Sequence, residues 1–124
     1  MRRSASALNV ALLLIVSAAC VRAQAADATR GKELYESRCT GCHSLDQDRI
    51  GPRHRGLIGR KAGAVEGFEY SPALRASRIV WSAQTLDRWL SGPERLIPGQ
   101  RMNYSVPEAA DRAALIAYLE AIGP

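Results

Sequence analysis

The chain has 124 residues, of which 47% are hydrophobic and 23% are charged. This length and this mixture fit one small globular domain, and they exclude a multidomain enzyme and a disordered or collagen-like chain. Lysine and arginine together number 17 against 12 aspartate and glutamate residues, which gives a formal net charge of +5.

The first 25 residues have the pattern of an export signal. Two arginines precede an apolar run over residues 5–19, and Ala23-Gln24-Ala25 has the small-residue pattern of a cleavage site. Cleavage after Ala25 removes three arginines, which leaves 14 basic and 12 acidic residues and lowers the net charge to +2. We therefore expect a periplasmic domain over residues 26–124 and no nucleic-acid partner.

Two other uses of the first segment stay open. A retained membrane anchor is disfavoured, because the apolar run is shorter than the roughly 20 residues that a membrane-spanning helix needs. A lipid on Cys20 is the second alternative, and Ser17, three residues earlier, fits such a signal poorly. We expect at most transient contact between the domain and a membrane surface.

Hydrophobic periodicity predicts four helices and no strand after the signal. The first is expected to begin at an Asp27 cap and to run through Arg38 towards the cysteines, and a short second helix begins at Ser71-Pro72 and runs through Leu74. Between them, residues 44–68 hold five glycines and show no helical period. A loop of this length is unusual in a small domain unless it wraps a group other than protein.

The third and fourth predicted helices have the clearest apolar faces. The third is capped by Ser82 and ended by Gly92-Pro93, while the last follows a capping-box pattern over residues 105–108 and stops at Gly123. Their apolar residues recur at three- and four-residue steps: Leu86, Trp89 and Leu90 in the third, and Leu115, Tyr118, Leu119 and Ile122 in the last.

The segment Cys39-Thr40-Gly41-Cys42-His43 has the C-x-x-C-H spacing of c-type haem attachment. On a helical turn, residues i, i+3 and i+4 share a face, so two thiols can add to the vinyl groups of a haem while the next imidazole reaches its iron. A redox-active cysteine pair lacks the strand and helix pattern that normally carries it. A zinc site needs four ligands, and only His54 remains to complete one. The motif favours covalent haem.

Met102 is the single methionine that remains once Met1 has left with the signal. It lies in a loop over residues 97–104, after a Pro98-Gly99 turn. A thioether is a suitable soft ligand for a haem iron that alternates between two oxidation states. A lone methionine is also a common core residue, so both interpretations of Met102 stay open at this point.

These motifs resemble those of the small mitochondrial-type class I cytochromes c. The resemblance covers the region after the signal through Cys39–His43, Gly51-Pro52, residues 56–60, residues 67–71, Trp81, residues 98–102 and residues 115–119. It implies an all-α cytochrome c fold of about four helices, with long loops wrapped around one covalent haem c. It also implies a soluble, monomeric one-electron carrier that is not an enzyme.

The resemblance further implies how the haem is held. Cys39 and Cys42 would bind it covalently, and His43 and Met102 would be the axial ligands of its iron. The carbonyl of Pro52 would accept a hydrogen bond from the ring nitrogen of His43 that does not bind iron. Such a bond fixes the orientation of the ring and raises the basicity of the ligand.

By the same resemblance, Arg60, Tyr70 and Trp81 would satisfy the inner haem propionate. If buried, Tyr70 and Trp81 each have a polar tip that needs a partner. The resemblance also implies that the first helix packs across the last one, with Gly31 near Tyr118.

Four residues differ from the pattern that the resemblance implies. They are His54, Leu74, Gln100 and Trp89. Hydrogen bonds and burial near the iron set its redox potential, so the potentials of family members need not apply to this chain. His54 is a weak rival to Met102 as a ligand, because it would approach the iron through the face that His43 occupies.

Redox partners are expected to dock over an exposed haem edge through Arg38, Arg95 and Arg101. Arginine offers a planar fork that suits the carboxylates of a partner. Two other functions stay open for such a haem protein. One is a peroxidase-like or gas-sensing protein with a labile methionine ligand, and the other is a haem-bearing subunit of a larger oxidoreductase complex.

Overall fold

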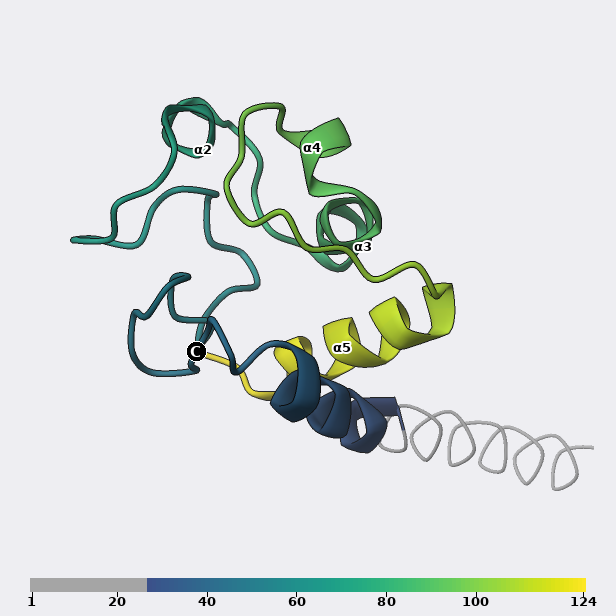
Figure 1. Cartoon of the computed structure of the whole chain (residues 1–124). Coiled ribbons are helices and arrows are strands. Elements are labelled where there is room, and N and C mark those ends of the chain that lie inside the picture. Colours follow the sequence, from purple (N-terminus) through teal and green to yellow (C-terminus); the bar gives the residue numbers. More distant parts are fainter. Residues whose placement is uncertain (1–26) are drawn as a thin grey trace, which may run out of the picture.

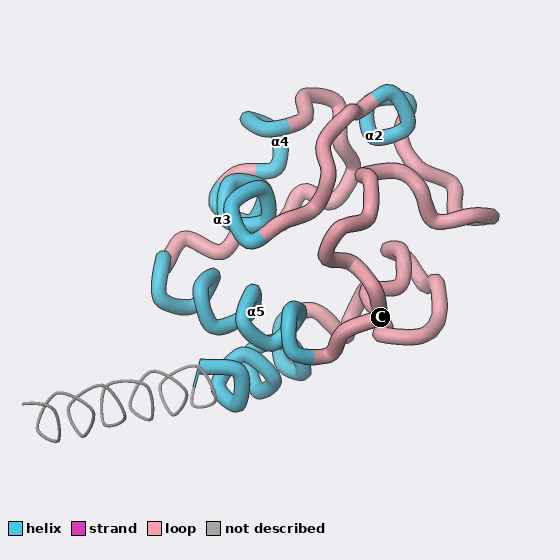
Figure 2. The backbone as a smooth tube through the Cα atoms, turned by 180° about the vertical axis from the view of Figure 1, so that it is seen from behind, coloured by secondary structure: helices cyan, strands magenta, loops and turns pink. Residues whose placement is uncertain are grey.

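The computed structural model describes residues 27–124, and the expected export signal, its cleavage site and Cys20 lie outside the described residues. The regular secondary structure of the described part is helical, and long loops connect the helices, with α2 lying among these loops (Figures 1 and 2). Its helices are residues 27–38, α2 (Pro72–Ala76), α3 (Ala83–Ser91), α4 (Pro93–Leu96) and α5 (Ala109–Ala121). Within residues 27–124 no strand forms beyond an isolated bridge between Lys61 and Val80. The expected all-α fold class is confirmed.

Among the described residues the first helix covers residues 27–38 and passes through Gly31, Tyr35 and Arg38 as predicted, but its predicted cap is wrong. Residue 27 is already helical, so Asp27 lies inside the helix and does not cap it. At the other end, the backbone nitrogen of Cys39 donates to the carbonyl of Tyr35 at 2.9 Å, which continues the helical hydrogen bonding into the cysteine motif. No helix within residues 27–124 is long and apolar enough to cross a membrane.

The predicted starts of α2 and α3 are confirmed. The hydroxyl of Ser71 accepts from the backbone nitrogen of Leu74 at 3.2 Å, and proline occupies the first turn of α2. At α3, Ser82 and Thr85 form a reciprocal capping box, in which each side chain accepts from the other residue's backbone nitrogen at 3.2 and 2.8 Å. These short-range bonds satisfy orphan donors of the first turn.

The chain between α3 and α5 differs from the prediction. Gly92 ends α3 as expected, but Pro93 then begins the unpredicted helix α4, because proline is well suited to a first helical position. The predicted capping box at residues 105–108 is wrong. Val106 donates to the carbonyl of Leu90 at 2.7 Å and is 1% exposed, so the chain arrives extended and α5 begins only at Ala109.

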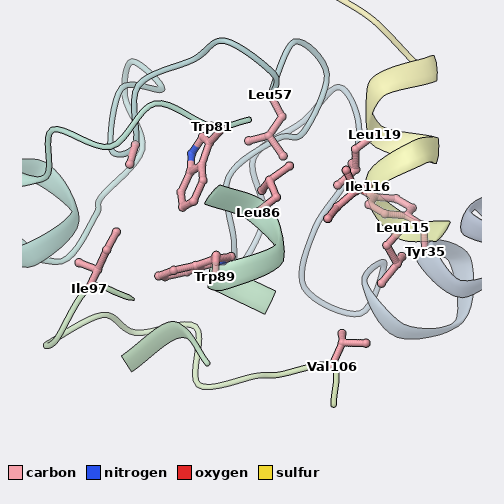
Figure 3. Close-up of a cluster of buried hydrophobic side chains, with 11 residues drawn as sticks. Tyr35, Leu57, Trp81, Leu86, Trp89, Ile97, Val106, Leu115, Ile116 and Leu119 are labelled. Atoms are coloured by element: carbon pink, nitrogen blue, oxygen red, sulfur yellow. The ribbon is translucent and has the colours of Figure 1, made fainter. Parts of the chain in front are cut away.

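The hydrophobic core lies between the first helix, α3 and α5 (Figure 3). It consists of Tyr35, Leu57, Ala62, Trp81, Leu86, Trp89, Ile97, Val106, Leu115, Ile116 and Leu119. Helix α3 packs against both α4 and α5. Several of these core side chains also form the walls of a cavity.

Candidate functional site

One cavity of about 590 Å³ is lined by residues from almost the whole described chain. The turn after the first helix, the loop over residues 50–70, α3 and the segment 101–104 all contribute to its walls. Its volume lies in the range typical of sites for small molecules and cofactors. All eight residues that the sequence assigns to the haem site line it: Cys39, Cys42, His43, Pro52, Arg60, Tyr70, Trp81 and Met102.

The C-x-x-C-H motif forms the expected turn. The backbone nitrogens of Cys42 and His43 donate to the carbonyl of Cys39 at 3.1 and 2.9 Å. Both cysteines are free thiols, with Cys39 partly buried and Cys42 exposed. Burial raises the pKa of the Cys39 thiol to about 11. The turn thus places two thiols and one imidazole on the wall of the same cavity.

The imidazole of His43 is oriented by the loop that follows it. Its Nδ1 donates to the carbonyl oxygen of Pro52 at 2.8 Å, which leaves the lone pair on Nε2. Burial lowers the pKa of His43, so the neutral ring is favoured. Gly51 passes so close that a Cβ there would lie 2.1 Å from Cε1 of the ring. A side chain at residue 51 would therefore displace this histidine.

His54 packs against His43 instead of facing it across the cavity. The two rings stack with centroids 4.0 Å apart and planes 24° apart. The Nδ1 atom of His54 lies 3.1 Å from the hydroxyl oxygen of Tyr35, within hydrogen-bond distance. Burial and the nearby His43 lower the pKa of His54 to about 3. Sequence reasoning placed His54 on the His43 side, but it missed the contact with Tyr35, which is distant in sequence.

The three residues assigned to a propionate lie on the loop walls and already have protein partners. Arg60 donates through its guanidinium to the carbonyls of Arg53 and Arg55 at 2.7 and 3.1 Å. The hydroxyl of Tyr70 accepts from the backbone nitrogen of Val65 at 3.3 Å and keeps its own proton to donate. The buried Trp81 ring packs against Trp89 with centroids 5.4 Å apart.

The cavity has apolar walls that the motifs alone did not assign to the site. The face of α3 predicted from periodicity, Leu86, Trp89 and Leu90, lies against the cavity. Phe68 also lines it, with its ring 4.7 Å from that of Tyr70. The amphipathic period was the available signal for α3, although it did not distinguish a core face from a cofactor face.

Only two of the three arginines predicted to dock partners line the cavity. Arg38 and Arg101 do so, and Arg38 also forms an ion pair with Asp111 at 3.1 Å. Arg95 lines a separate small pocket and donates to the carbonyl of Ser91 at 2.9 Å.

A small helical domain with a C-x-x-C-H turn and a methionine on the wall of one cavity has the arrangement of a c-type cytochrome domain. The family model described as cytochrome c matches residues 28–123. The chain belongs to the cytochrome c family.

Relatives and solved structures agree with this assignment. Over 98 residues the chain is 41% identical to the cytochrome c-type cyt cy of Rhodobacter capsulatus, and the match covers 77% of this chain and 49% of that relative. It is also 41% identical to cytochrome c type-1 of Ascaris suum, over 76% of this chain and 87% of the relative. The solved structure of cytochrome cH from Methylobacterium extorquens is 30% identical with a TM-score of 0.72, and the match covers 76% of this chain and 97% of that one.

Membership of this family gives the general function. Cytochromes c carry covalently attached haem and transfer electrons. The chain is therefore a haem-based electron carrier and not an enzyme.

Proposed function

We propose that this protein is a periplasmic carrier of single electrons with one haem c. In this proposal Cys39 and Cys42 bind the haem through thioether bonds, and His43 and Met102 are the axial ligands of its iron. The observation that carries the proposal is that all four side chains line one cavity, while Nδ1 of His43 is already bonded to Pro52. A bound haem supplies a one-electron change at its iron.

The cavity residues fit such a group. The bond from His43 to the Pro52 carbonyl orients the ring and makes Nε2 a stronger donor to iron. Gly51 leaves room for the ring where any side chain would displace it. The apolar face of α3 excludes water, and low polarity around the iron helps to set the potential.

The polar residues on the loop walls have a separate role in this proposal. Arg60, Tyr70 and Trp81 satisfy the inner propionate with a guanidinium, a hydroxyl and an indole N–H group. Two observations support this role: each of the three side chains lines the cavity, and Tyr70 and Trp81 are buried. The negative charge of a propionate among such donors would be balanced by the guanidinium and stabilised by the two hydrogen bonds.

Electron partners dock, in this proposal, where the cavity reaches the surface. Cys42 is exposed there, and Arg38 and Arg101 belong to the lining. A carrier must also dissociate, which favours a small, polar and salt-sensitive contact below about 1,200 Å² between a monomer and its partner. Arg95, on its separate pocket, contributes less than the other two arginines.

The experiment that tests covalent haem is a visible spectrum of the exported protein in both oxidation states, followed by acid-acetone extraction. Thioether-linked haem stays with the protein, whereas haem that is released by the treatment contradicts the proposal. His43→Ala is expected to prevent stable maturation, because metal binding and folding are coupled.

The experiment that tests the sixth ligand is Met102→Ala. The oxidised protein should show a weak near-infrared charge-transfer band that disappears in this variant. The potential should also fall, because methionine stabilises the reduced iron. A five-coordinate spectrum of the resting protein would instead favour a peroxidase-like or gas-sensing role. Stoichiometric co-purification with another chain through high salt would favour a subunit of a larger complex.

A further inference from the structure

The loop that carries Met102 is held by a network of side chains with Gln100 at its centre. Gln100 is 6% exposed. Its Nε2 donates to Oδ1 of Asn103 at 2.8 Å and to Oε2 of Glu94 at 3.2 Å, while its Oε1 accepts from the backbone nitrogen of Asn103 at 3.0 Å. Both amide hydrogens and the amide oxygen therefore have partners, as a buried amide requires.

The two hydrogen bonds between Gln100 and Asn103 close a ring with the intervening backbone, and Met102 belongs to this ring. Asn103 has a φ of 48°, and within residues 27–124 it is the one residue other than glycine with positive φ. Asparagine tolerates this left-handed conformation better than most residues. The turn and the ring together determine how the chain passes through residue 102, whose side chain lines the cavity.

Glu94 attaches this ring to the helical part of the fold. Its Oε1 accepts from the backbone nitrogen of Gly99 at 2.9 Å, and its Oε2 accepts from Gln100. Glu94 lies in α4, and α4 packs against α3. One carboxylate thus joins two consecutive loop residues, Gly99 and Gln100, to the helices.

We propose that Glu94, Gln100 and Asn103 form a clamp that positions Met102 for the haem iron and limits how easily another ligand replaces it. The inference rests on the proposed function, because it requires Met102 to be the sixth ligand. The three residues act through Met102 and do not touch the iron, so they are positioning residues.

The clamp acts through the conformational freedom of the loop. When the sixth ligand dissociates, a clamped loop gains little freedom, so dissociation is opposed and competing ligands bind weakly. A loop without the clamp gains more freedom, which makes the open state easier to reach. The loss of one or two hydrogen bonds corresponds to about a tenfold change in such an equilibrium.

Glu94→Gln is the sharpest test, because it preserves the shape of the side chain. Gly99 N and Gln100 Nε2 are both donors, so whichever way the new amide turns, its NH₂ group faces one of them. The probe is imidazole, titrated into the oxidised, haem-loaded protein and followed by its visible spectrum. We expect the dissociation constant of imidazole to fall about tenfold while the near-infrared band without imidazole persists.

A second variant keeps the test valid if Glu94→Gln does not mature. Asn103→Gly removes the Oδ1 acceptor while keeping a residue that adopts a φ of 48° without strain. It should bind imidazole more tightly in the same way. Glu120→Gln is the matched control, since it removes the same charge from an exposed position on α5, and its imidazole affinity should equal that of the wild type.

The outcomes separate this inference from the proposed function. Wild-type imidazole affinity in both clamp variants, with the near-infrared band retained, would overturn the clamp and leave Met102 as the ligand. If the band is absent from the wild type and Met102→Ala has an unchanged spectrum, the proposed ligation is wrong and the clamp is overturned with it. Tighter imidazole binding in both variants, with none in the control, supports the clamp.

Discussion

Gly31 of the first helix touches the backbone of Ala114 in α5. A Cβ on Gly31 would lie 1.9 Å from the carbonyl oxygen of Ala114 and 2.8 Å from Cβ of Tyr118. The two helices therefore cross where one of them has no side chain, and this close approach brings the rings of Tyr35 and Tyr118 to 5.3 Å. Because the first helix leads directly into Cys39, the crossing also positions the cysteine motif.

Gly31→Ala should destabilise the protein by about 3 kcal/mol, at the upper end for overpacking, because the new methyl group meets backbone that cannot rotate away. The gain in helix propensity, about 1 kcal/mol, is too small to offset this. Urea unfolding of the haem-loaded protein measures the change. The control is Gly41→Ala, where a Cβ would have no atom within 4 Å, and its stability should stay within about 0.5 kcal/mol of the wild type. Equal stability of the two variants would refute the close crossing.

Gly51→Ala should displace the ring of His43, because its Cβ would lie 2.1 Å from Cε1. The bond from Nδ1 to the Pro52 carbonyl then lengthens, the imidazole becomes a weaker donor, and the oxidised iron is less stabilised. We expect the reduction potential to rise by tens of millivolts, measured by spectroelectrochemistry. Pro52→Ala keeps the backbone carbonyl, so its potential should change much less. A Gly51→Ala protein with the wild-type potential would contradict this role of Gly51.

Arg60→Gln should lower the reduction potential. A positive charge beside the haem favours the reduced iron, and Arg60 lines the cavity while it donates to the carbonyls of Arg53 and Arg55. We expect a fall on the order of tens of millivolts, from the Coulomb energy of one charge at a protein surface. Lys61→Gln removes the same charge from the next, exposed residue and should have little effect. Equal shifts in both variants would mean that Arg60 acts only through net charge.

Arg38→Gln combined with Arg101→Gln should slow electron transfer to a negatively charged protein by about tenfold at low salt, and should flatten its dependence on ionic strength. Arg101 is exposed and has no ion pair within residues 27–124, so its charge is free for a partner. Arg95→Gln is the comparison, because Arg95 does not line the cavity that Arg38 and Arg101 line. Stopped-flow rates across a salt series measure the effect. A wild-type rate that does not change with salt would exclude electrostatic docking.

The sequence by itself determined those features that depend on residues close together in the chain. The turn at Cys39–His43 and the caps at Ser71 and Ser82 need only neighbours three or four residues away. The apolar period of α3 likewise reports which face is covered, since Leu86 and Trp89 are its buried residues. In α5 the period identifies Leu115 and Leu119 but misses the buried Asp111 and Ile116. For this reason the helical fold and the position of the cysteine turn follow from local patterns.

The tertiary structure alone decided the features that join distant segments. Val106 is held against Leu90, and this contact delays the start of α5 past the expected capping box. His54 meets Tyr35 and stacks on His43 only because the loop after the motif folds back against the first helix. These contacts depend on side chains brought together by the packing of the helices, and the free energy of that packing outweighs local preferences when the two conflict.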